Sequence, residues 1–180
     1  RDAESLKAHV RRESPDILVT LESDAWWQEQ LDALEGYPHR IACPLDNRYG
    51  MHVYSRLPLH EPTIDYLVED DIPSMAAFVE LSDGERVRFH VIHPTPPAPG
   101  ENPRSTERDV ELLMLAHRLE DLEEPIVVTG DLNDVAWSAT TQLFRRRSGL
   151  LDPRVGRGMF NTFHAMHWYF RWPLDHTFVS

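Results

Sequence analysis

The sequence predicts an α/β protein built around a mixed β-sheet, and three observations lead to this prediction. Helical segments alternate with apolar segments of strand length near both ends of the chain, and hairpin-like strands occupy its centre. The chain has 180 residues, the length of one domain. Its composition, 41% hydrophobic and 27% charged residues, is that of a packed globular protein rather than a disordered chain or a coiled coil.

The first part of the chain reads as helix, strand and helix. Residues 3–12 have apolar positions at helical spacing and stop before Pro15, because the residue before a proline disfavours helix. Residues 16–22 form a β-branched apolar run, which predicts a strand buried on both faces with Glu22 at its carboxyl end. A second helix is expected to begin at Ser23 or Asp24, both good N-cap residues.

The centre and the last part supply the remaining elements. Short strands are expected near residues 51–55, 75–81 and 86–92, and the proline-rich residues 93–103 predict a stiff surface loop. The later elements expected are a helix over 105–119 with Val110, Leu113, Met114 and Leu119 on its apolar side, a buried strand over 125–130, a helix over 139–147 and a strand over 174–179.

Charge and cysteine content exclude several classes of function. Thirty acidic residues against eighteen basic ones give a formal charge of −12, which disfavours duplex nucleic acid as a partner. The single cysteine, Cys43, excludes an intramolecular disulfide and a cysteine-built zinc or iron–sulfur site. No apolar run approaches the roughly 20 residues that a membrane-spanning helix needs. The GxSxG, Walker and GxGxxG motifs are all missing.

Polar residues stand where predicted strands end or begin. Ligands of layered α/β folds bind beyond the carboxyl ends of strands, so we take these residues as site candidates. They are Glu22, His93, Asp131, Asn133 and Asp175. Carboxylate, amide and imidazole groups without cysteine suit Mg²⁺ or Mn²⁺ better than zinc. Such an ion suits phosphate chemistry, because it neutralises the charge that develops on the phosphoryl oxygens while a carboxylate takes a proton from water.

Each candidate also has a structural interpretation. Glu22 could be a solvated turn residue, Asp134 could be only an N-cap, and Asp175 could pair with Arg154 or Arg171. Three further groups are assigned structural roles in preference to functional ones. They are the His164–His167 pair, read as surface histidines rather than metal ligands; the arginine run 145–147, read as a solvated face; and Trp168, Tyr169, Phe170 and Trp172, read as core or edge packing rather than a substrate rim or a lipid contact.

Taken in order, five segments resemble the motifs of the endonuclease/exonuclease/phosphatase superfamily, the deoxyribonuclease-I-like fold. The matching segments are residues 16–22 ending in Glu22, residues 49–59 with their Ser-Arg-x-Pro turn, residues 91–94 with His93, residues 129–133 with Gly-Asp-x-Asn, and residues 173–180 with Asp175. The resemblance implies a four-layer αββα sandwich with two mixed sheets, and a phosphoesterase that uses Mg²⁺ or Mn²⁺.

The resemblance also implies a role for each candidate residue. Glu22 would bind the metal, and Asp131 would orient or deprotonate the attacking water. Asn133 and His93 would contact the phosphoryl oxygens, and Asp175 would orient a partner histidine or assist the metal. The most favoured activity is that of a phosphodiesterase. The alternatives are a nuclease and a catalytically degenerate binding module with the same fold.

Two motifs of the family are missing from residues 1–180: an Asn strand before the first helix and a Ser-Asp-His strand after Asp175. We therefore expect a single domain that lacks its first and last strands, with inertness as the alternative. The acidic charge favours a lipid or small phosphoester substrate over duplex DNA, while nucleic acid stays an alternative. By analogy, the chain is expected to be the soluble part of a membrane-anchored bacterial protein, associated with the membrane through regions outside this sequence.

Overall fold

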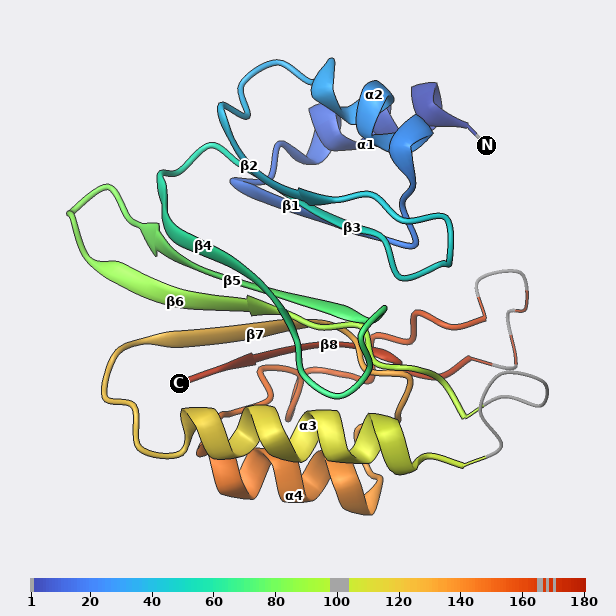
Figure 1. Cartoon of the computed structure of the whole chain (residues 1–180), viewed down its shortest axis with the longest axis vertical. Coiled ribbons are helices and arrows are strands. Elements are labelled where there is room, and N and C mark those ends of the chain that lie inside the picture. Colours follow the sequence, from blue (N-terminus) through green and yellow to red (C-terminus); the bar gives the residue numbers. More distant parts are fainter. Residues whose placement is uncertain (1, 98–103, 165–166, 168, 170) are drawn as a thin grey trace.

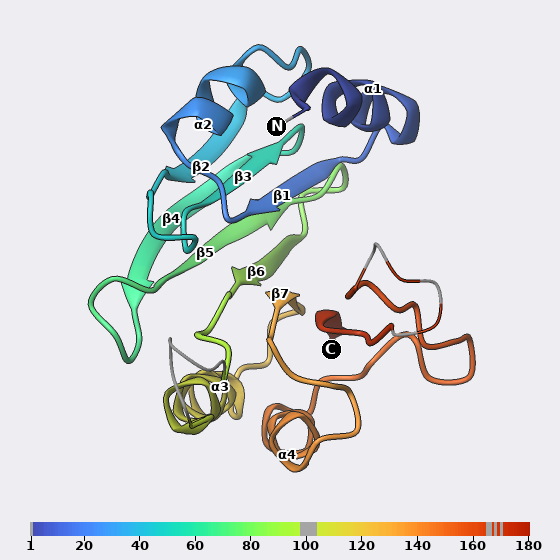
Figure 2. The same ribbon diagram turned by 90° about the vertical axis from the view of Figure 1, so that its right-hand side faces the viewer.

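The chain folds into four layers, with two β-sheets stacked between two pairs of helices (Figure 1). This computed structural model describes residues 2–97, 104–164, 167, 169 and 171–180. Helices α1 (Ala3–Glu13) and α2 (Ala25–Asp32) cover the smaller sheet, and α3 (Thr106–Leu119) and α4 (Ala139–Ser148) cover the larger one (Figure 2). The predicted αββα sandwich is therefore confirmed. Residues 98–103 of the predicted proline-rich loop lie outside the described residues.

The two sheets have different topologies. The strands in chain order are β1 (Ile17–Leu21), β2 (His39–Cys43), β3 (Met51–Ser55), β4 (Leu59–Tyr66), β5 (Pro73–Glu80), β6 (Arg86–Val91), β7 (Ile126–Asp131) and β8 (Asp175–Val179). In the described part of the chain, the smaller sheet has the order β1-β3-β2 and the larger sheet the order β4-β5-β6-β7-β8. Only β6 and β7 pair in parallel there, and α3 is the crossover between them. The segments that follow β6 and β7 therefore emerge at the same edge.

The larger sheet is mixed, as predicted, whereas the pairs within the smaller sheet are antiparallel. Its central strand, β3, lies between β1 and β2 and runs opposite to both, so no parallel contact forms among these three strands. All five residues of β1 are half-buried rather than fully buried. The expectation of a strand buried on both faces is corrected here, because β1 lies at the edge of its sheet among the described residues.

Strands β2 and β4 were not predicted. In β4, residues 61–66 are exposed, and the pairing with β5 shifts register between His60 and Thr63. Pro62 lies at this shift, where a proline is tolerated because the ladder is interrupted. Both strands lack the apolar alternation by which strands are recognised, because β2 has a single fully buried residue, Ile41, and six consecutive residues of β4 are exposed.

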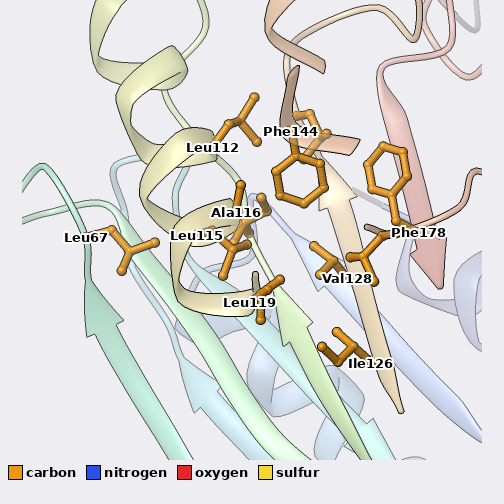
Figure 3. Packing of buried hydrophobic residues seen from close by; sticks show 12 residues of the cluster. Leu67, Leu112, Leu115, Ala116, Leu119, Ile126, Val128, Phe144 and Phe178 are labelled. Carbon is orange, nitrogen blue, oxygen red and sulfur yellow. The ribbon is translucent and has the colours of Figure 1, made fainter. Parts of the chain in front are cut away.

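The largest core cluster lies between the five-stranded sheet and the helices α3 and α4 (Figure 3). It includes Leu112, Leu115, Ala116 and Leu119 of α3, Phe144 of α4 and Phe178 of β8. A second cluster fills the space between the sheets, and a third lies under α1 and α2. Among the helices of the described residues, none has both the length and the apolar composition needed to cross a bilayer.

The buried face of α3 differs from the predicted one. Val110 and Met114, expected on the apolar side, are 41% and 37% exposed, while Leu119 is buried as expected. The core face begins with two charged residues, Arg108 and Glu111, which are also buried. These charges interrupt the apolar stripe at its start, so the sequence pattern indicated a neighbouring face instead.

Candidate active site

The predicted site residues lie at one end of the sandwich, where β1, β6 and β7 end and β8 begins; Figure 2 looks onto this end. Glu22 follows β1, His93 lies two residues beyond β6, Asp131 is the last residue of β7 and Asp175 is the first residue of β8. Asn133 follows Asp131 in the loop toward α4. The positions from both sheets therefore converge, although they are far apart in sequence.

The backbone at Glu22 is fixed by contacts made by the next residue. The Ser23 N–H donates to the Gly50 carbonyl oxygen at 2.9 Å, and the buried Ser23 hydroxyl lies 2.7 Å from Nδ1 of buried His52. A Cβ at Gly50 would lie 2.1 Å from the Ser23 carbonyl oxygen, so only glycine allows this approach. Glu22 itself is exposed and has a φ of +54°, which turns the chain sharply after β1.

His93 is buried, with 3% of its surface exposed, and its Nδ1 atom has no hydrogen-bond partner among the described residues. Its ring lies 5.4 Å from the ring of Tyr49. Burial lowers the pKa of His93, while the carboxylates of Glu22 and Asp175 raise it. The imidazole is therefore neutral at pH 7, and both carboxylates lie within electrostatic range of it.

Gly130 allows the end of β7 to pass directly against the end of β6. It has a φ of +150°, and a Cβ at this position would lie 1.8 Å from the Ile92 carbonyl oxygen. Because Ile92 precedes His93 and Gly130 precedes Asp131, this close approach brings the two site residues together.

We expect Gly130→Ala to lower the free energy of unfolding by at least about 3 kcal/mol, because the methyl group meets backbone atoms that no rotamer change can move. Urea unfolding followed by tryptophan fluorescence measures the loss. Gly84→Ala is the matched control: Gly84 also has positive φ, +87°, but nothing lies within 4 Å of its Cβ position. Equal losses in the two variants would contradict the importance of the close approach.

Asp131 and Asn133 form a compact turn after β7. The Asn133 N–H donates to Asp131 Oδ1 at 2.8 Å, and Asn133 Nδ2 donates to the Pro94 carbonyl oxygen at 2.9 Å. Burial raises the pKa of Asp131 to about 6; the Asn133 N–H opposes the rise and the Asp175 carboxylate adds to it. The turn is thus tied to the segment that carries His93, and Asp131 can exchange a proton near neutral pH.

Asp175 lies directly opposite Asp131 in the β7–β8 ladder and is exposed. Its N–H donates to Thr162 Oγ1 at 3.2 Å. Beside it opens a cavity of about 460 Å³ between the two sheets. The cavity is lined by Val19 and Leu21 of β1, Thr129 and Gly130 of β7, Asp175, His176 and Thr177 of β8, and Pro153, Arg154, Phe160 and Thr162 of the preceding loop.

Two of the structural alternatives can now be tested. Arg154 donates to the carbonyl oxygen of Asp175, at 3.2 Å, and forms its ion pair with Asp152 at 2.8 Å. The residue that caps α4 is Ser138, while buried Asp134 accepts hydrogen bonds from the hydroxyls of Ser138 and Thr141. Asp134 thus supports the start of α4 without being its N-cap.

A supporting network around His176 was missed by the sequence interpretation. Arg154 Nη2 lies 2.6 Å from His176 Nδ1, and His176 Nε2 lies 2.8 Å from the Asp134 carbonyl oxygen. Because arginine only donates, Nδ1 accepts and Nε2–H donates, and burial lowers the pKa of His176. The neutral ring joins the loop after β7 to β8. No local motif signals this network, because Asp134, Arg154 and His176 are separated by 20 to 42 positions.

The remaining sequence candidates have mixed outcomes. His164 and His167 are not in a helix among the described residues, and their rings lie 4.7 Å apart. Of the predicted aromatic cluster, Trp168 and Phe170 lie outside the described residues. Tyr169 and Trp172 are 60% and 38% exposed, so they do not lie in the core, and of the expected core or edge packing only the edge position fits them. The arginine run includes an exposed Arg147 that contacts Glu120 on α3 at 3.4 Å, as expected of a solvated face.

The donor set at this end of the sandwich fits Mg²⁺ or Mn²⁺. Among the described residues, no three His, Cys, Asp or Glu side chains are grouped closely enough to enclose a metal. Mg²⁺ commonly takes only one or two protein carboxylates and completes its shell with water and substrate phosphate oxygens. Glu22 is exposed, and its carboxylate and that of Asp175 both lie within electrostatic range of His93. These two carboxylates fit this open type of site.

Comparison with solved structures shows the same fold in proteins of low sequence identity. Zebrafish (D. rerio) TDP2 complexed with single-strand DNA product aligns with a TM-score of 0.77 at 17% identity, over 98% of this chain and 75% of that one. The mannosyl-6-phosphatase of Bacteroides thetaiotaomicron aligns with a TM-score of 0.76 at 18% identity, over 99% of this chain and 76% of that one. The human Nocturnin catalytic domain aligns with a TM-score of 0.74 at 18% identity, over 99% of this chain and 74% of that one.

A comparison with curated proteins gives no match. The sequence profile of the Endonuclease/Exonuclease/phosphatase family matches residues 1–180, the whole of the chain. This match agrees with the αββα layers and with the order of the polar strand ends. The chain therefore belongs to the endonuclease/exonuclease/phosphatase family.

Proposed function

We propose that the protein is a divalent-metal-dependent phosphodiesterase that hydrolyses a phosphoester bond with an activated water molecule. Family membership supports a phosphoester hydrolase in general. The observation that carries the finer proposal is that the carboxylates of Glu22 and Asp175 lie within electrostatic range of a buried, neutral His93, while Asp175 lies opposite Asp131 in the β7–β8 ladder. Three carboxylates at the same end of the sandwich attract a cation and provide a proton acceptor.

Each residue has a distinct part in this chemistry. Mg²⁺ or Mn²⁺, held by Glu22 with Asp175 assisting, would neutralise charge on the phosphoryl oxygens. Asp131 accepts a proton from the attacking water, which suits its raised pKa. Neutral His93 donates a ring N–H to a phosphate oxygen. Asn133 Nδ2 donates one N–H to Pro94 and carries a second, which we assign to the phosphoryl group.

The substrate that we propose is a lipid or small-molecule phosphoester rather than duplex DNA. The support is the formal charge of −12, which repels a polyanion at moderate salt. The carboxylates at the site add to this repulsion unless a cation is bound there. Duplex DNA bound tightly, with an affinity that falls steeply as salt rises, would reverse the preference.

The test is hydrolysis of bis-p-nitrophenyl phosphate by the purified protein with Mn²⁺. We expect release of p-nitrophenol that EDTA abolishes and excess Mn²⁺ restores. Glu22→Gln should raise the Mn²⁺ concentration needed for half-maximal rate at least about tenfold, because an amide is a weaker ligand than a carboxylate. Glu29→Gln, at an exposed position of α2, is the matched control and should behave as the unsubstituted protein.

Three results would count against the proposal. Hydrolysis that EDTA leaves unchanged would exclude metal dependence. An equal Mn²⁺ requirement in Glu22→Gln and Glu29→Gln would remove Glu22 from the metal site. A folded protein with no turnover at any Mn²⁺ concentration would support the alternative, an inert binding module with the same fold.

A further inference from the structure

The connection between α4 and β8 exposes a concentration of large apolar side chains. Of the fourteen large hydrophobic side chains that the described residues expose, seven lie within residues 151–172. They are Leu151 (61% exposed), Val155 (70%), Met159 (52%), Phe160 (61%), Phe163 (48%), Tyr169 (60%) and Trp172 (38%). We call this segment the apolar loop. Exposed apolar side chains scattered singly are ordinary, but a concentration of this kind indicates a contact surface.

Backbone pairing holds part of the apolar loop in place. Phe163 and Trp172 form an antiparallel bridge, in which the Phe163 N–H donates to the Trp172 carbonyl oxygen at 2.9 Å and the Trp172 N–H donates back. Ring centroids lie 5.1 Å apart between Phe163 and His164, and 5.9 Å apart between His167 and Tyr169. In the part of the loop that the structure describes, these exposed side chains belong to none of the three core clusters.

The apolar loop is also the basic part of an acidic protein. Residues 151–172 contain three arginines, two histidines and one acidic residue, Asp152, which gives +2 with neutral histidines. Since the whole chain carries −12, the remaining residues carry −14. Asp152 is buried and pairs with Arg154, whereas Arg157 and Arg171 are exposed. Positive charge is thus presented together with the exposed rings.

The apolar loop lies beside the candidate active site. Phe160 and Thr162 line the 460 Å³ cavity that Asp175 also lines, and Thr162 Oγ1 accepts the Asp175 N–H. In Figure 2, the described parts of the loop, coloured orange to red, lie to one side of β7 and of the C-terminal end of the chain. A surface that contacts this loop is therefore brought next to the end of the sandwich where the carboxylates lie.

We propose that the apolar loop docks the protein onto an anionic lipid bilayer. Tryptophan and tyrosine favour the bilayer interface, where a ring contacts acyl chains and its polar atom stays hydrated. Arginines next to them are attracted to acidic head groups. A second copy of the chain is a poorer occupant, because a two-fold contact between apolar loops would place like charges together. This docking is a property of the loop and does not depend on catalysis.

The test is co-sedimentation of the purified protein with vesicles of phosphatidylglycerol and phosphatidylcholine in equal amounts. We expect binding that weakens in phosphatidylcholine alone and in high salt. Phe160→Ser/Tyr169→Ser should raise the lipid concentration for half-maximal binding at least about tenfold, because two exposed rings are lost. Val110→Ser/Met114→Ser removes two exposed apolar side chains from α3, 41% and 37% exposed, and should bind as the unsubstituted protein.

A second pair of variants separates local from overall charge. Arg157→Gln/Arg171→Gln should weaken binding roughly 25-fold, about fivefold for each arginine near the surface. Arg11→Gln/Arg118→Gln changes the total charge equally but outside the loop, and should have little effect. All variants are first compared with the unsubstituted protein by circular dichroism and urea midpoint, so that a folding defect is recognised.

Several outcomes would overturn the proposal. Equal binding by Phe160→Ser/Tyr169→Ser and Val110→Ser/Met114→Ser would show that the loop is not the contact. Equal effects of the two arginine pairs would show that only overall charge matters. A protein that is dimeric in analytical ultracentrifugation and becomes monomeric on Phe160→Ser/Tyr169→Ser, without vesicle binding, would assign the loop to a contact between copies. None of these measurements requires turnover, so the proposed phosphodiesterase activity is tested separately.

Discussion

Asp131→Asn is expected to lower kcat for bis-p-nitrophenyl phosphate by about 10²- to 10⁴-fold, the usual contribution of a positioned general base. The carboxylate Oδ1 accepts the Asn133 N–H at 2.8 Å, and an amide oxygen can keep this bond, so the turn after β7 should persist. What is lost is the proton acceptor. The rise in rate through the pKa of Asp131, about 6 for the metal-free group, should disappear in the variant.

The matched control for this prediction is Asp121→Asn. Asp121 is exposed and precedes the start of β7, at the end of the strand opposite to Asp131. Initial rates from pH 5 to 9 and urea midpoints are measured for both variants. If Asp131→Asn keeps its activity and its pH profile while folding normally, Asp131 is not the base, and the proton acceptor must be sought elsewhere at the site.

Glu111→Gln is expected to stabilise the protein at neutral and alkaline pH. Glu111 is 2% exposed on α3, and its buried Oε1 has no hydrogen-bond partner among the described residues. Burial raises the pKa of Glu111 to about 8, and the Glu69 carboxylate adds to the rise. The folded protein therefore holds a proton here that the unfolded chain releases near pH 4.5.

The sign of this pH dependence follows from the proton count. Between the unfolded and folded pKa values the folded state binds more protons, so the free energy of unfolding falls as pH rises and levels off above about 8. At about 1.4 kcal/mol for each pH unit above 4.5, the free energy of unfolding has fallen by about 3 kcal/mol at pH 7. Gln has no proton to release, so the variant should gain about this amount at pH 7 and nothing near pH 4.

Urea unfolding at pH 4, 7 and 9 measures the effect, with Glu123→Gln as the control. Glu123 is exposed in the turn after α3, and its substitution should change the unfolding free energy by no more than about 0.5 kcal/mol at any of these pH values. A Glu111→Gln variant that is destabilised more at pH 9 than at pH 4 would mean that the carboxyl makes a necessary contact in its ionised form.

The strands that the sequence predicted well are those with buried or alternating side chains. All five residues of β3 are buried, and β7 alternates between buried and half-buried positions, so their apolar runs are clear. Strands β2 and β4 lack such a pattern, because β2 has a single fully buried residue and residues 61–66 of β4 are all exposed. The pairing partners of these two strands come from elsewhere in the chain, which a local pattern does not contain.

The positions of the candidate residues at strand ends could be predicted from the sequence, but the contacts between separate segments could not. Polar residues after apolar runs mark strand ends, and this signal is local, as at Glu22 and Asp131. The position of Asp175 directly opposite Asp131 depends on the register of two strands 44 positions apart in the sequence. The Ser23–His52 contact and the Arg154–His176 contact likewise depend on packing between separate segments. These supports were therefore missed.

The pairing of β6, β7 and β8 has a consequence for the order of folding. Arg88 pairs with Ile126, 38 positions later, and Val127 pairs with Val179, 52 positions later. Contacts between such distant segments form slowly, because long loops must close before the pairs are gained. The hairpin of β5 and β6 closes over a much shorter loop. On refolding from urea, hydrolytic activity should therefore return in the slowest phase, after most secondary structure has already formed.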